Sequence, residues 1–307
     1  MAHFVHLSDP HLTPLQHVAA RDLLGKRLLG FLSWQRRRRF RHLPQLLRLV
    51  TADALQSAPE HFAITGDLTQ IGLPAEHVLA EQWLRSLGDP AHVSLSPGNH
   101  DFYARSSTNS VYANWSSYLH GRNGWPIRRD CGDMSFISLN SGTPSGAAFA
   151  TGRLGAQQLQ RLPAALDEAR GRYRVLLVHH SPHPQGHHWR KRLTDAAALR
   201  AIVDSCGAEL ILHGHAHSAT LEWLELANRR VPVLGAPSAS LQSRDPAHRA
   251  GYHRIQVSRL PGNGPDRTPG GTDDQHAPYW ATEIETRQCI DGRLQTSARH
   301  AFNLPVA

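Results

Sequence analysis

The sequence is poor in cysteine and in long apolar runs, and each shortage excludes a class of protein. Its 307 residues include three cysteines, Cys131, Cys206 and Cys289, which are too few and too scattered for a disulfide framework or a thiolate zinc site. No segment reaches the roughly 20 consecutive apolar residues that a membrane-spanning helix needs. The N-terminus lacks the basic and then apolar stretch of a secretory signal, so we expect a cytoplasmic protein.

Histidine, proline and arginine are abundant by contrast. The chain has 22 histidines and 20 prolines, and arginine greatly exceeds lysine. A net charge of +8 and a pI near 10.0 favour an anionic partner, which could be a nucleic acid, a membrane surface or a phosphorylated small molecule. The length would suit one large α/β domain or two small ones. We expect a single domain over residues 1–307, with a basic amphipathic insertion at about 15–42 and a flexible loop at about 259–278.

Five short apolar runs, each typical of a buried strand, are followed by side chains that can bind a metal. Helical spacing of apolar residues predicts helices between them, at 43–54, 78–87, 154–169 and 194–206. Further strands are expected at 136–139, 231–234, 252–257 and 279–285, and residues 102–130 are expected to form a long loop. The runs and the residues after them are 4–7 with Asp9 and His11, 62–65 with Asp67, 92–95 with Asn99, 175–178 with His179, and 210–212 with His215 and His217.

Ligands in an α/β sheet gather beyond the carboxyl ends of its strands, so these side chains can meet although they span more than half of the chain. The set combines imidazole, carboxylate and amide oxygen without sulfur. This donor chemistry suits zinc, manganese, iron or cobalt better than copper(I) or a cluster. The sequence therefore predicts a metal site.

The same residues form five ordered blocks between positions 9 and 217. The blocks Asp9-x-His11, Gly66-Asp67, Gly98-Asn99-His100, His179 and Gly214-His215-x-His217 resemble the signature of the calcineurin-like metallophosphoesterase superfamily. The stretch Gly66-Asp67-Leu68-Thr69, with Gly72 and Glu76, further resembles the branch of class III cyclic nucleotide phosphodiesterases and glycerophosphodiesterases. The resemblance implies an α/β fold, a four-layer α/β/β/α sandwich with the metal site at the C-terminal ends of the strands.

Carried over residue by residue, the resemblance implies two divalent or trivalent metal ions, manganese, iron or zinc. One ion would be held by Asp9, His11, Asp67 and His217, and the other by Asp67, Asn99, His179 and His215. Asp67 would bridge them, and His100 would hold a phosphate oxygen or protonate the leaving alkoxide. Asp101 could orient the His100 imidazole or lie at the surface.

The other histidines are expected to have ordinary roles. His180 and His183 are expected either to line the pocket or, for His180, to bind a backbone carbonyl, and His213 is expected behind the site or in the core. A surface or core role is expected for His3, His17, His42, His120, His276 and His300.

These residues predict a dinuclear metal-dependent phosphodiesterase that hydrolyses a phosphodiester by attack of a metal-bound hydroxide. One alternative is a membrane-surface hydrolase of a phosphorylated lipid or nucleotide-lipid, although His100 stands where the diacylglucosamine pyrophosphohydrolases carry arginine. A nuclease is a second alternative. A basic nucleic-acid-binding module with a vestigial metal site would need damaged ligands, and none is damaged.

The lipid alternative depends on the insertion at about 15–42. Leu24, Leu28, Phe31, Leu32 and Gln35 are spaced for one helical face, and Arg21, Lys26, Arg27 and the basic run at 36–41 surround them. Such a segment would make peripheral contact with an anionic membrane. The competing interpretations are a cap over the protein's own core or pocket and a contact within a homo-oligomer.

Overall fold

Strands and helices alternate through most of the chain, as the apolar pattern predicts. The computed structural model describes residues 1–13, 15, 18–119, 124–146, 148–184, 189–262 and 277–306. Its α-helices are α1 (Lys26–Arg36), α2 (Pro44–Gln56), α3 (Pro74–Leu87), α4 (Ser107–Asn114), α5 (Ala156–Asp167) and α6 (Ala196–Cys206). Short 3₁₀ turns lie at η1 (Ala20–Asp22), η2 (Arg38–Phe40), η3 (Pro90–His92) and η4 (Pro246–His248).

The strands form two six-stranded sheets. The first has the order β12-β11-β10-β1-β2-β3, and the second has the order β4-β5-β6-β7-β9-β8. Strands β1, β2 and β3 run parallel, as do β5, β6, β7 and β9, whereas the remaining neighbours pair antiparallel. The bounds are β1 (Ala2–Leu7), β2 (His61–Ile64), β3 (Val93–Leu95), β4 (Ile127–Cys131), β5 (Met134–Ser138), β6 (Tyr173–Leu177), β7 (Leu210–His213), β8 (Thr220–Glu225), β9 (Arg230–Gly235), β10 (Gly251–Leu260), β11 (Tyr279–Ile290) and β12 (Arg293–Pro305).

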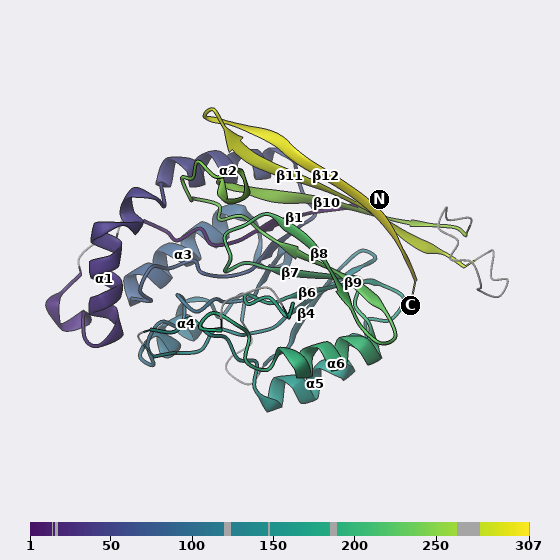
Figure 1. Ribbon diagram of the computed structural model, residues 1–307, viewed down its shortest axis with the longest axis horizontal. Coiled ribbons are helices and arrows are strands. Elements are labelled where there is room, and N and C mark those ends of the chain that lie inside the picture. The colour runs from purple at the N-terminus through teal and green to yellow at the C-terminus, as the bar shows by residue number, and fades with distance from the viewer. Residues whose placement is uncertain are drawn as a thin grey trace.

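Three apolar cores separate four layers, which confirms the predicted α/β/β/α sandwich (Figure 1). The sheets pack face to face through side chains such as Phe4 and Phe136, whose rings meet edge to face at 5.1 Å. Helices α2 and α3 cover the outer face of the first sheet, with Val50 and Leu84 fully buried. Helices α5 and α6 cover the second. Because both faces of the central strands are covered, every residue of β2, β3, β5, β6 and β7 is buried.

Several elements differ from the sequence prediction. Helix α4 and strand β4 occupy residues predicted as one loop at 102–130, and β8 and β12 were not predicted at all. Most residues of β12 are exposed, so this edge strand has little apolar signal and is specified mainly by its pairing with β11. Strand β10 extends to Leu260, which shortens the loop predicted at 259–278; residues 263–276 of that loop lie outside the described part.

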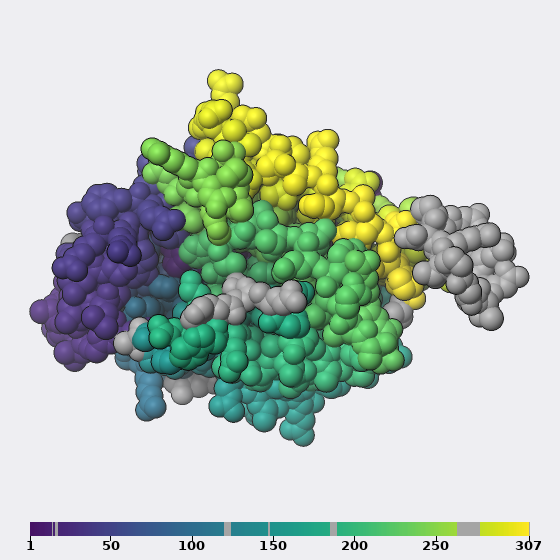
Figure 2. All heavy atoms as spheres, viewed as in Figure 1, coloured from purple at the N-terminus to yellow at the C-terminus, as the bar shows by residue number. Residues whose placement is uncertain are grey.

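The insertion at about 15–42 forms a helix, but not with the predicted apolar stripe. Helix α1 begins at Lys26, so Leu24 precedes it, and the residues that α1 buries are Arg27, Gly30 and Trp34. This segment forms the purple end of the molecule in Figure 2. Across the described ranges, no helix combines the length and apolar character needed to cross a membrane.

Candidate metal centre

The C-terminal ends of parallel strands from both sheets meet at one edge of the sandwich. Asp9 and His11 follow β1, Asp67 follows β2, and Asn99 with His100 follow β3. The second sheet contributes the predicted ligands that lie just beyond β6 and β7. They are His179 after β6, and His215 and His217 after β7.

The backbone at these positions is unusual. Seven described residues other than glycine have a positive φ, and five of them are predicted ligands. Left-handed backbone is costly for side chains with a Cβ and persists only where surrounding contacts hold it. Backbone strain is therefore found in the loops that carry the predicted ligands. The five are Asp9 (φ 50°), His11 (40°), Asp67 (54°), His215 (66°) and His217 (54°).

One group of predicted ligands surrounds Asp9. The His217 Nε2 atom lies 3.0 Å from Asp9 Oδ1, and His11 Nε2 lies 3.8 Å from the same oxygen. The His11 and His217 Nε2 atoms are 3.3 Å apart, and His11 Nε2 is 3.9 Å from Asp67 Oδ2. The structure thus brings together the four residues predicted to hold the first ion.

A second group shares Asp67. Its Oδ2 atom lies 3.3 Å from His179 Nε2, while its Oδ1 accepts a hydrogen bond from the His100 backbone N–H at 2.7 Å. The side chains of Asp9, Asp67 and His179 offer atoms within 4.8 Å of one another, and His179 and His215 belong to another such group. Asp67 therefore stands between the two groups, where the prediction places a bridge.

Backbone carbonyls orient two of the imidazoles. The His11 Nδ1 atom donates to Thr69 O at 3.0 Å, and His179 Nδ1 donates to Thr65 O at 2.6 Å. With Nδ1 bound to these carbonyls, each Nε2 is the ring nitrogen that faces the site. This arrangement is typical of histidines that bind metals.

Burial discourages a charge on Asp67 and on His179, but their proximity keeps both ionised. The His179 imidazole holds the pKa of Asp67 well below its usual range, against the effect of burial. Asp67 in turn raises the pKa of His179 to about 9 against the effect of burial. A cation between these two side chains would replace the proton that His179 otherwise carries.

The buried polar atoms fit a metal. Among the described residues, Asp9 Oδ1, Asn99 Oδ1 and His179 Nε2 are buried without a hydrogen bond of acceptable geometry. Leaving such atoms without partners costs about 1–3 kcal/mol each, so three at one site favour the binding of a cation there. Carboxylate, amide oxygen and imidazole are donors for zinc, manganese and iron. The residues present therefore fit the predicted cations.

His100 lies beside this centre with one ring nitrogen already occupied. Its Nδ1 donates to Gln70 O at 2.6 Å, and Arg38 Nη1 lies 3.1 Å from the same nitrogen. The ring packs edge to face on His11 with centroids 4.8 Å apart. Burial lowers the pKa of His100 to about 4, and Arg38 acts in the same direction, although Asp67 opposes them. The imidazole is therefore neutral, and Nε2 is the nitrogen left for a substrate.

Asp101 neither orients His100 nor lies at the surface. Its carboxylate is fully buried and accepts hydrogen bonds from the backbone N–H groups of Gly98, Asp67, Leu68 and Thr69 at 2.8 to 3.1 Å. One side chain thus fixes the loop after β2 against the loop after β3. Sequence proximity to His100 suggested the wrong partner, because the donors lie on another loop.

Two residues near the centre were missed or assigned an ordinary role. His42 is buried, and its ring lies 4.5 Å from that of His11 and 5.5 Å from that of His217. Arg38, from the basic run of the insertion, reaches the Gln70 carbonyl beside His100. Neither position follows an apolar run, so the signal that identified the other residues was absent there.

The remaining histidines near the site bind to the protein itself. The Nδ1 atom of His180 lies 2.8 Å from Ser141 Oγ, and its Nε2 lies 3.2 Å from the carbonyl oxygen of Ala150. His213 Nδ1 donates to Gly214 O at 2.9 Å. These contacts agree with the carbonyl-binding role expected for His180. His17, His120 and His276 lie outside the described residues.

The family to which the chain belongs follows from a direct match. A family model described as calcineurin-like phosphoesterase matches residues 2–219, so the chain belongs to this family. The protein is therefore a metal-dependent hydrolase that acts on phosphoesters. The predicted resemblance is thereby confirmed.

Individual relatives are more distant. A probable cyclic nucleotide phosphodiesterase of Synechococcus sp. is 27% identical over 210 residues, which cover 66% of this chain and 73% of the relative. A purple acid phosphatase from yellow lupin (Lupinus luteus) seeds shares the fold with a TM-score of 0.54 and 12% identity, over 99% of this chain and 53% of the lupin protein. GAP50, the anchor in the inner membrane complex of Plasmodium, has a TM-score of 0.50 and 10% identity. The match covers 99% of this chain and 89% of GAP50. This chain spans about half the length of the lupin protein.

Proposed function

We propose that this enzyme is a phosphodiesterase with two metal ions, held by the residues predicted from the sequence. The observation that carries the proposal is the position of Asp67, whose carboxylate lies between two groups of donor atoms. Asp9, His11 and His217 would complete one ion's ligands, and Asn99, His179 and His215 the other's. Two such ions would polarise a phosphoryl group and activate a water for in-line attack.

The protein's own residues would position the substrate and move a proton. The Gln70 carbonyl fixes the Nδ1 proton of His100, so a proton can be gained or lost only at Nε2. A bound phosphoryl anion would raise the pKa of this imidazole by favouring its charged form. His100 would then hold a phosphoryl oxygen or pass its proton to the leaving alkoxide, which benefits a diester most.

A panel of substrates tests the preference. Purified enzyme with added manganese, iron or zinc should hydrolyse bis(4-nitrophenyl) phosphate, cyclic nucleotides or glycerophosphodiesters with a higher kcat/KM than 4-nitrophenyl phosphate. The name of the Synechococcus relative supports including cyclic nucleotides. A phosphomonoester hydrolysed ten times more efficiently than every diester would contradict the proposal.

The membrane-surface alternative has its own supporting observation. Leu24, Leu28, Leu29 and Phe40 are between 44% and 77% exposed, and four exposed arginines at 36, 37, 39 and 41 lie in the same segment. Basic residues near an anionic surface contribute about 1 kcal/mol each. Flotation with acidic vesicles at low and high salt tests this contact. We propose that the chain forms a single metallophosphoesterase domain. Assays on the same purified enzyme test the two remaining alternatives, nuclease activity and a homo-oligomer.

A further inference from the structure

A cleft of about 540 Å³ opens next to the candidate metal centre. Asn99 and His100 belong to its lining, so a molecule bound in the cleft lies against the predicted ligand Asn99 and the imidazole of His100. Helix α1 and Arg38 of η2 form one wall, and the segments at 148–150 and 190–191 form the other.

The lining of this cleft carries positive charge only. It includes Lys26, Arg38, Arg190 and Lys191, and no aspartate or glutamate. Lys26 and Lys191 are the only two lysines of the chain, and both are here. Within the described ranges, Lys26, Arg38 and Lys191 form no ion pair with a carboxylate. Several cations on low-dielectric walls concentrate an anion between them.

Fixed contacts hold two of these cations in place. Lys26 Nζ donates to Ser145 Oγ at 2.9 Å and lies 4.6 Å from the centre of the Tyr103 ring. Arg38 Nη2 donates to Gly30 O at 2.7 Å. Burial lowers the pKa of both Lys26 and Arg38, so their charged forms lack the solvation that a bound anion would restore.

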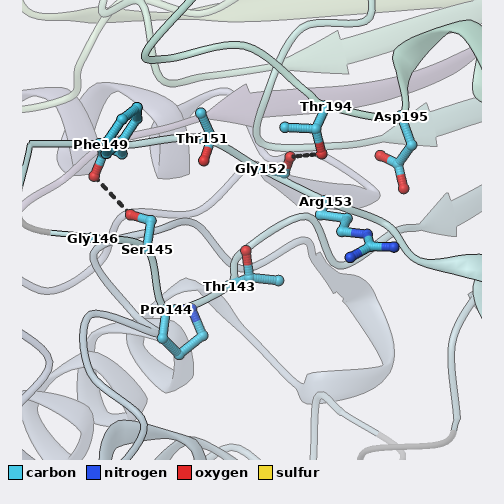
Figure 3. Close-up of a pocket in the computed structure, with 10 residues that line it drawn as sticks. All are labelled: Thr143, Pro144, Ser145, Gly146, Phe149, Thr151, Gly152, Arg153, Thr194 and Asp195. Atoms are coloured by element: carbon cyan, nitrogen blue, oxygen red, sulfur yellow. Dashed lines mark hydrogen bonds between the residues drawn. The ribbon is translucent and has the colours of Figure 1, made fainter.

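The facing wall is also built by specific bonds. Ala150 N–H donates to Arg190 O at 2.9 Å, and Gly152 N–H donates to Arg192 O at 3.1 Å. The Ser145 hydroxyl, which receives the Lys26 bond, donates in turn to Phe149 O (Figure 3). Phe149 lines both the cleft and a second cavity, which Thr143, Arg153 and Asp195 also line and which contains none of the predicted ligands (Figure 3).

We propose that the cleft binds a second anionic group of the substrate, a phosphate carried at a distance from the phosphoester that is hydrolysed. This inference rests on the proposed function, because it assigns the scissile group to the metal centre and the second group to Lys26, Arg38, Arg190 and Lys191. The favoured substrates are therefore phosphoesters with an additional phosphate, and substrates whose remainder is uncharged gain nothing from the cleft.

A matched pair of substrates isolates the second group. Thymidine 5′-(4-nitrophenyl phosphate) and its 3′-phosphorylated form release the same chromophore and differ only in that phosphate. We expect the wild-type enzyme to show a kcat/KM about tenfold or more higher for the 3′-phosphorylated substrate, as a charge-assisted contact allows. The variants Lys191→Met and Lys26→Met should each reduce this ratio, and the double variant should bring it close to one. The change should come mainly from a higher KM for the 3′-phosphorylated substrate.

The variants keep the inference falsifiable. Lys191 is exposed, so Lys191→Met should fold normally even if Lys26→Met disturbs helix α1. Arg48→Met removes an exposed cation from α2 and is the control, in which the ratio should stay at the wild-type value. A ratio near one in the wild type, or a ratio unchanged in Lys191→Met and in the double variant, overturns the inference.

Binding without turnover separates this inference from the proposed function. Calorimetry on the metal-loaded enzyme should show tighter binding of thymidine 3′,5′-bisphosphate than of thymidine 5′-monophosphate, with the difference lost in the lysine variants. If this difference holds while neither diester is hydrolysed, the diesterase proposal is wrong and the anion cleft stands. If both diesters are hydrolysed equally and both products bind equally, the cleft is wrong and the diesterase proposal stands.

Discussion

His100 and Asp67 are in contact, but their side chains have different predicted roles. The Asp67 carboxylate lies among the predicted ligands, whereas the His100 ring lies beside them with Nδ1 bound to Gln70 O. His100→Ala should therefore keep the metal content of the wild type while kcat falls by about a hundredfold or more, as for the loss of an acid-base group. Elemental analysis and steady-state kinetics on the same preparation measure both quantities. Loss of metal together with activity would instead make His100 a residue that supports the ligands.

The sequence predicted the seven proposed ligands because each follows an apolar run by a few residues. Parallel strands then bring those positions to one edge without further information. The positive φ angles of Asp9 and Asp67, and the roles of Arg38, His42 and Asp101, were not predictable in this way. They depend on contacts between segments far apart in the chain. His42, for example, lies beside His217 because the chain after η2 pairs with the segment after β9, where Leu43 N–H donates to Ser240 O and Gln242 N–H donates to Arg41 O.

At the scale of elements, the loops after β2 and β3 must approach each other closely. A Cβ added at Gly98 would overlap Asp67 Oδ1 and lie 2.6 Å from Asp67 N. Gly98→Ala should thus push the Asp67 carboxylate from its position and lower metal affinity or activity by about 10- to 100-fold. Gly146→Ala is the matched control, since its Cβ meets only Phe149 Cδ2 at 3.5 Å. Equal metal affinity and activity in the two variants would mean that the loops can separate without consequence.

Elements with strong apolar periodicity were predictable, and polar ones were not. Helices α2, α3, α5 and α6 and the central strands agree with the pattern because each buries a regular apolar face. Helix α4 is rich in serine and asparagine, and β12 is mostly exposed. These two elements are stabilised by their neighbours rather than by their own composition. In α1, the inward-facing Gly30 packs on Tyr103 so closely that a side chain there would overlap its hydroxyl.

At the scale of the whole molecule, a polar network ties α2 to the first sheet. Asp53 accepts hydrogen bonds from Arg287 Nη2 at 2.7 Å and Nε at 2.9 Å, and from the Tyr252 hydroxyl at 2.5 Å. Burial acts to raise the pKa of Asp53, but these bonds and the nearby Arg254 lower the pKa below the usual value of an aspartate. A carboxylate with a lowered pKa in the folded state stabilises the fold above its unfolded pKa, and this contribution is lost as the pH falls through the folded pKa.

Asp53→Asn should therefore lower Tm by a few degrees at pH 7. The difference from the wild type should remain constant down to about pH 5 and then shrink as the wild-type carboxylate becomes protonated below pH 4. Thermal unfolding across this pH range measures it. Asp133→Asn, in the exposed turn between β4 and β5, is the control and should show no such pH-dependent difference. A Tm difference for Asp53→Asn that is independent of pH would exclude the ionised network as its cause.

The measurement that tests the central claim most directly is the metal content of Asp67→Ala. Because Asp67 lies between both groups of donors, its removal should lower the bound metal from two ions per chain to fewer, and hydrolysis of phosphodiesters should be abolished. Elemental analysis after loading with manganese, iron or zinc, performed beside the wild type and His100→Ala, provides the number. Two ions per chain with normal turnover in Asp67→Ala would contradict a metal centre organised around this carboxylate.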